Sequence, residues 1–130
     1  MNSISEQLDK IRIVIGRLEL SKMIAKYYTK STKTDIGDIG ILYEKYQQVC
    51  NPECKDNTKL FIFLAFYFYD PVSLVSKRML RGNVRKEVGK VLGISGSAVT
   101  RHFADAKSLF YHHKGFRDEA ERLFALLQDG

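Results

Sequence analysis

The chain of 130 residues is poor in helix-breaking and cross-linking residues. Its two prolines lie between apolar segments, so long stretches are free to be helical. It has only two cysteines and no secretion signal, and we therefore expect a cytoplasmic protein in a reducing compartment. The longest apolar run, 60–69, has ten residues, whereas a membrane-spanning helix needs about 20. We therefore expect this run to be buried and the protein to have no membrane partner.

Signatures of catalysis and of cofactor binding are also missing. No glycine-rich phosphate loop is present, and Ser, His and Asp show no spacing typical of a catalytic triad. Structural zinc needs four ligands. Cys50 and Cys54 have a tolerable spacing, but the adjacent His112 and His113 would point about 100° apart on a helix, which poorly serves one ion. We therefore predict no enzyme activity, no cofactor and no metal.

Acidic residues are scarce between residues 76 and 117, where the positive charge is concentrated. This segment holds ten Lys or Arg and only two acids, Glu87 and Asp105, so its net charge is +8. The whole chain has a net charge of +6, so the remaining residues together carry −2. One explanation is a solvated basic face. The concentration in one segment favours the other explanation, a surface that faces phosphates.

The apolar residues make up 45% of the chain, which is enough for a core, and their spacing predicts an all-α protein of about six helices. We divide it into an N-terminal helical segment, 1–56, and a helical domain, 57–130. The predicted helices span 3–30, 38–49, 57–69, 71–80, 83–92, 96–112 and 116–128.

The first predicted helix carries a heptad-like seam of large aliphatic residues at intervals of four and three. The seam covers about two heptads, fewer than the three or four that are typical of a coiled coil. Two hypotheses stay open: the helix packs on its own domain, or it joins two chains in a homodimer. The seam consists of Ile4, Leu8, Ile11, Ile15 and Leu18.

Two amphipathic helices, 83–92 and 96–112, are separated by a short turn. Gly93 can adopt the left-handed conformation that closes a helix. Ile94 would enter the core between the helices, and Ser95 can accept a hydrogen bond from the first amides of the second helix. The second helix has one apolar face and one face that is small, polar and basic, as a helix that enters a DNA groove requires. The residues on that second face are Ser97, Thr100, Arg101 and Ala104.

The run from Lys86 to Phe103 resembles the helix-turn-helix of bacterial transcription regulators and sigma factors. The resemblance implies a recognition helix in the major groove and a motif spanning about 84–112; we recognise no family in residues 1–76. Gly89 stands where alanine is more common, and glycine weakens a helix. The residues expected in the motif core are Val88, Gly89, Gly93, Ile94, Val99 and Phe103.

We therefore expect an all-α protein, of bacterial or phage type, that binds double-stranded DNA through this motif in its C-terminal half and regulates transcription. The alternatives are a DNA-packaging or replication accessory protein of a phage or mobile element, and a helical protein-interaction module. The expected base-facing residues are Ser97, Thr100, Arg101 and Ala104, and the expected phosphate-facing residues are Arg85, Lys86, Lys90, Ser95 and Lys107.

Overall fold

The structure is a computed structural model that describes residues 3–17, 37–75 and 82–128, without the side chains of 14–17. These residues form six α-helices and one 3-10 helix, and no strand occurs among them, so the all-α prediction is confirmed. The elements are α1 (Ile4–Arg17), α3 (Asp38–Val49), α4 (Asn57–Tyr69), η1 (Pro71–Leu74), α5 (Gly82–Leu92), α6 (Gly96–His112) and α7 (Lys114–Gln128).

Helix α4 forms the centre of the molecule. Eight of its 13 residues are buried, and α3, α5, α6 and α7 all contact it. A helix that is apolar on every side must be covered on every side. The predicted bounds of this helix are confirmed, as are those of α3 and α6. None of the described helices is both long enough and apolar enough to cross a membrane.

Aromatic contacts fix α6 and α7 against α4. The ring of Phe63 stacks on that of Phe110 with centroids 4.5 Å apart, and it meets Phe116 edge-on at 6.3 Å. One turn further along, Phe66 lies 4.8 Å from Phe103. Because these rings are buried, α6 is anchored along its length and its opposite face is left outside.

Helix α1 packs on the same core through the first part of the predicted seam. The exposed fractions of Ile4, Leu8 and Ile11 are 0%, 1% and 3% within a single chain. These three side chains are therefore already covered within one chain, which leaves little of their surface for a second chain, and the homodimer stays a hypothesis. The side chain of Ile15 and all of Leu18 lie outside the described residues.

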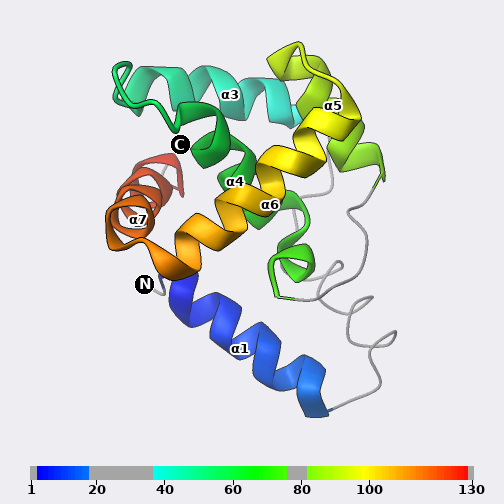
Figure 1. Cartoon of the computed structure of the whole chain (residues 1–130), viewed down its shortest axis with the longest axis vertical. Coiled ribbons are helices and arrows are strands. Elements are labelled where there is room, and N and C mark those ends of the chain that lie inside the picture. Colours follow the sequence, from blue (N-terminus) through cyan, green and yellow to red (C-terminus); the bar gives the residue numbers. More distant parts are fainter. Residues whose placement is uncertain (1–2, 18–36, 76–81, 129–130) are drawn as a thin grey trace.

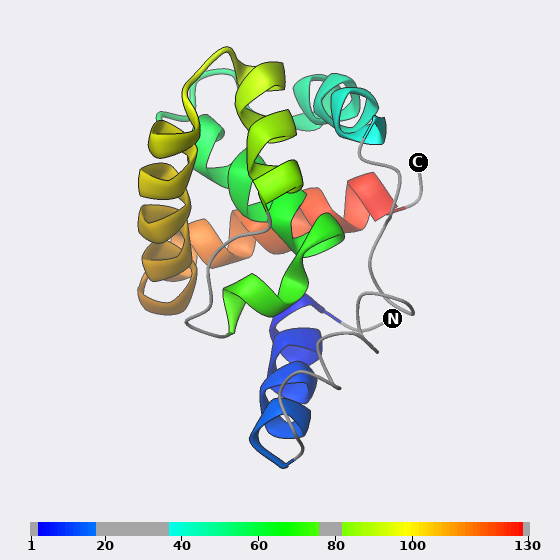
Figure 2. The same ribbon diagram turned by 90° about the vertical axis from the view of Figure 1, so that its right-hand side faces the viewer.

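Polar contacts complete the docking of α1. The amides of Ile4 and Ser5 donate to the two carboxylate oxygens of Glu121 on α7, at 2.8 and 3.4 Å. The Arg12 guanidinium donates to the Tyr111 hydroxyl at 2.9 Å and lies over its ring. Figures 1 and 2 both place α1 at the end of the molecule opposite α3 and α5. The N-terminal helix therefore lies far from the turn between α5 and α6.

We expect Glu121→Ala to lower the free energy of unfolding by about 1 kcal/mol, since helix caps contribute about 0.5–2 kcal/mol. Without this carboxylate, the amides of Ile4 and Ser5 would lose a charged acceptor. Chemical denaturation measures the loss. The matched control is Glu119→Ala on the same helix, which removes a surface pair with Arg122 at 2.7 Å. This variant is expected to lower the free energy of unfolding by only about 0.3 kcal/mol. Equal losses in the two variants would contradict the capping role.

The segment after α4 differs from its prediction. A helix was expected from Pro71 to residue 80, but the chain forms a single 3-10 turn that ends at Leu74, and residues 76–81 lie outside the described part. Asp70 precedes this turn, and its side chain makes no cap hydrogen bond. Instead the Ser73 hydroxyl donates to the Asp70 carbonyl at 2.6 Å inside the core. The predicted helix 3–30 is described only as far as Arg17, and its remaining residues lie outside the described part.

Candidate nucleic-acid interface

Three residues, Gly93, Ile94 and Ser95, connect α5 to α6. Gly93 has a φ of +71°, the only positive φ among the described residues. The Gly93 amide donates to the Lys90 carbonyl at 3.3 Å, and the Ile94 amide donates to the Gly89 carbonyl at 2.9 Å. This is the Schellman arrangement that closes a helix through a left-handed residue. The predicted role of Gly93 is confirmed.

The start of α6 is capped as predicted. The Ser95 hydroxyl accepts a hydrogen bond from the Ala98 amide at 3.1 Å. The cap uses a lone pair of this exposed hydroxyl and leaves its hydrogen available, so its expected role toward phosphate stays a prediction. The hydrogen bonds that close α5 and the cap of α6 together fix the orientation of the two helices relative to each other.

Gly89 lies tightly against the turn and the start of α6. A Cβ atom added there would lie 2.8 Å from the carbonyl oxygen of Ile94 and 3.4 Å from Cγ2 of Val99. The first distance is shorter than a carbon–oxygen contact allows, and it involves backbone, which gives way less readily than a side chain. The glycine that weakens α5 as a helix is therefore required by the turn that follows it.

Most of the residues expected in the motif core are buried. Val88, Gly89 and Val99 are fully buried, Phe103 is nearly so, and Ile94 packs partly buried against them. Gly93 is exposed and serves the turn rather than the core.

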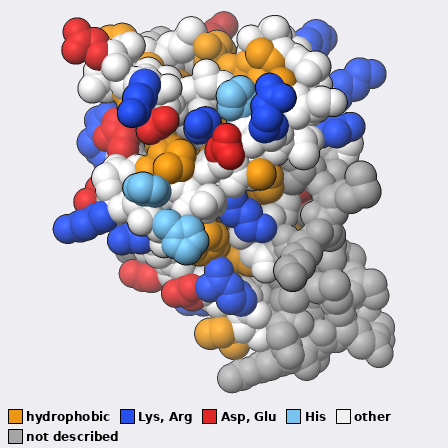
Figure 3. Space-filling view, viewed as in Figure 1, with side chains coloured by type: hydrophobic (Ala, Val, Ile, Leu, Met, Phe, Trp, Pro, Cys, Tyr) orange, Lys and Arg blue, Asp and Glu red, His pale blue; other side chains and the backbone are white. Residues whose placement is uncertain are grey.

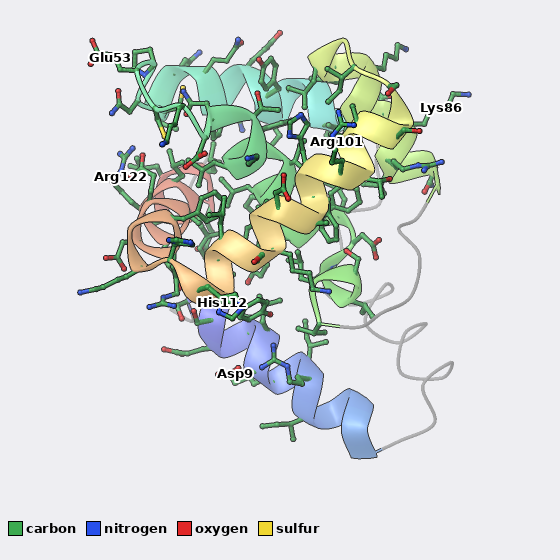
Figure 4. All side chains as sticks on the ribbon, viewed as in Figure 1. Asp9, Glu53, Lys86, Arg101, His112 and Arg122 are labelled. Atoms are coloured by element: carbon green, nitrogen blue, oxygen red, sulfur yellow. The ribbon has the colours of Figure 1, made fainter. Side chains whose placement is uncertain are left out.

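The opposite face of α6 is exposed and crosses the front of the molecule in Figure 1. All four expected base-facing residues lie on it, and all four are exposed: Ser97, Thr100, Arg101 and Ala104. Figure 4 shows Arg101 near the start of α6 and Lys86 at the outer side of α5. Figure 3 shows Lys and Arg side chains spread over this face, with acidic side chains among them. One acid, Asp105, lies 3.8 Å from the ammonium group of Lys59.

The expected phosphate-facing residues are divided by the structure. Lys86 and Lys90 on α5 are exposed. Arg85 is half-buried, and its guanidinium reaches the Thr100 hydroxyl on α6 at 3.3 Å. That contact spans the turn, and no spacing rule in the sequence indicates it.

Lys107 requires a correction. Its ammonium group donates to the Ser73 carbonyl at 3.3 Å, which ties α6 to η1. Burial lowers the pKa of Lys107, and the nearby charge of Arg12 lowers it further. A lysine held in this way is not presented to a phosphate beside the exposed face of α6. The helical period placed it at the edge of that face, but packing of η1 against α6 decides its partner.

The chemistry available at this face is hydrogen bonding and charge. The described residues contain no group of three or more His, Cys, Asp or Glu that could hold a metal ion, and Cys50 and Cys54 are free thiols. A hollow of about 550 Å³ lies between the start of α4 and the turn from α6 to α7, and none of the four expected base-facing residues lines it. Comparison of the chain with known protein families, curated proteins and solved structures finds no match.

Proposed function

We propose that this protein binds double-stranded DNA by placing α6 in the major groove and that it regulates transcription. The observation that carries the proposal is the exposed N-terminal half of α6. It presents hydroxyl groups, an arginine and a small residue on one face, while the other face is anchored by buried aromatic rings. A groove about 12 Å wide admits one α-helix, and small side chains allow its backbone to approach the base edges.

The charges around α6 support the same docking. Lys86 and Lys90 are exposed on α5, and Arg101 is exposed on α6. In a helix-turn-helix the first helix crosses the DNA backbone, so the two lysines would meet phosphates while Arg101 would read a base. Asp105 would be unfavourable next to a phosphate, but it lies further along α6 and is paired with Lys59.

Duplex binding that falls steeply with salt is the expected result. Each phosphate neutralised adds about −0.9 to the slope of log affinity against log salt for B-DNA. Replacing Lys86 and Lys90 by Gln should therefore flatten this slope by about two and weaken binding to every sequence alike. Fluorescence anisotropy with a duplex that the protein selects from a random pool measures both quantities.

A matched control is Lys45→Gln together with Lys55→Gln, which removes the same charge from the α3 helix and the loop that follows it. It should leave the slope almost unchanged. Equal flattening in both pairs would show that only total charge matters. Absence of duplex binding in the unaltered protein would overturn the proposed function and favour a protein-interaction module. Selection of a defined motif would favour regulation over packaging.

A further inference from the structure

The contact that Arg85 makes with α6 does not follow from the periodicity of α5, the helix to which Arg85 belongs. It belongs to the first turn of α5, yet its guanidinium lies over the start of α6. Its Nη1 is 3.3 Å from the Thr100 hydroxyl, and a Cβ on Gly96 would lie 3.5 Å from its Cζ and Nε atoms. These distances are ordinary van der Waals contacts, so the guanidinium lies directly against the first turn of α6.

The hydroxyl of Thr100 is almost fully used. A threonine hydroxyl has one hydrogen and two lone pairs. Thr100 donates its hydrogen to the Gly96 carbonyl at 3.1 Å and accepts from Arg85. It has no hydrogen left to donate to a base or a phosphate in this arrangement. Thr100 was expected to face the bases directly, and its bonds indicate a different role.

Arg85 keeps the capacity that Thr100 lacks. A guanidinium has five N–H donors, and Thr100 engages one of them. Two of the remaining donors suffice for the bidentate contact with O6 and N7 of guanine, which is the commonest specific contact in the major groove. Because arginine has much rotamer freedom to lose on binding, a hydrogen bond that holds its head in place beforehand favours the contact.

We propose that Arg85 reads a guanine in the major groove and that Thr100 is its positioning residue. The proposal rests on the proposed function, since it requires α6 to enter the groove. It assigns Arg85 to the bases rather than to the phosphates, because its guanidinium lies beside Gly96 and Thr100 on the helix that would occupy the groove. Arg101, one residue beyond Thr100, would read a different base pair.

The test begins with selection of a duplex from a random pool by the unaltered protein. Arg85→Ala should reduce affinity for the selected duplex about tenfold or more, with little change on a scrambled duplex. Repeating the selection with this variant should remove one guanine preference from the motif. Arg101→Ala is the matched control, and it should relax a different position.

Thr100 is tested through its dependence on Arg85. Thr100→Val keeps the shape of the side chain and removes the hydroxyl, so it should weaken the same guanine preference by a few-fold, and Thr100→Ser should restore it. In the presence of Arg85→Ala, adding Thr100→Val should change affinity no further. Thermal denaturation of each variant confirms that it is folded at the assay temperature.

A modified duplex tests whether N7 of the guanine accepts the hydrogen bond from Arg85. With 7-deazaguanine at the assigned position, which lacks N7, the unaltered protein should lose affinity and Arg85→Ala should not. Equal losses of Arg85→Ala on the selected and scrambled duplexes would overturn base reading and assign Arg85 to phosphate. Additive losses of Arg85→Ala and Thr100→Val would overturn the positioning role. In both cases the unaltered protein still binds duplex, so these failures are distinct from failure of the proposed function.

Discussion

Replacing Ile4 and Leu8 together by aspartate is expected to unfold or aggregate the protein. Both side chains are buried in the same core cluster as the aromatic residues of α4. Each loses roughly 1.5–3 kcal/mol of burial, and each new carboxylate must also be desolvated or expose the core. The combined loss, on the order of 5 kcal/mol or more, is comparable with the whole stability of a small domain. Circular dichroism and light-scattering mass on one sample measure the outcome.

The same helix offers a control. Ile13 is 53% exposed, so Ile13→Asp should change the free energy of unfolding by no more than about 0.5 kcal/mol. The dimer hypothesis predicts a different result for the double variant, namely a folded protein of lower mass. Detection of that species would restore the dimer and contradict packing of α1 within one chain.

The apolar periodicity of the sequence predicts which faces are buried but not what buries them. The intervals of α6 identify Val99, Phe103, Ala106 and Phe110 as its inner face, and all four are buried. The seam of α1 was equally clear, yet it was compatible with two partners. In the structure Ile4 and Leu8, at the start of the seam, belong to the same buried cluster as the aromatic residues of α4.

Polar partners are predicted less well, since they depend on how helices far apart in the sequence are placed. Ser95 caps the helix that it precedes, which local spacing indicates. The contacts of Glu121 with Ile4 and of Lys107 with Ser73 span 117 and 34 positions. The exposed face of α6 follows from local spacing and was predicted. The link from Arg85 to Thr100 joins two helices and was not predicted.

Gly89 illustrates how the helical context changes the meaning of a residue. By intrinsic propensity, alanine stabilises a helix interior by about 1 kcal/mol relative to glycine. That reasoning marks Gly89 as a weakness of the motif. The space around it reverses the expectation, because an added Cβ would meet the Ile94 carbonyl at 2.8 Å. This carbonyl belongs to the turn, whose position is held by the bond from the Ile94 amide to the Gly89 carbonyl.

Gly89→Ala should therefore lower the free energy of unfolding, by about 1–3 kcal/mol, and Gly89→Val should lower it further because its branched side chain also crowds Val99. The matched control is Gly40→Ala within α3, where an added Cβ meets nothing within 4 Å. There the gain in helix propensity acts alone and should raise stability by up to about 1 kcal/mol. Denaturant titration of the variants measures the difference in sign. Stabilisation of both alanine variants by the same amount would show that α5 and α6 do not approach as closely as the turn requires.

If the signs differ as expected, Gly89→Ala should also reduce duplex affinity at temperatures where it is folded, because any relief of the contact displaces α6 relative to Lys86 and Lys90.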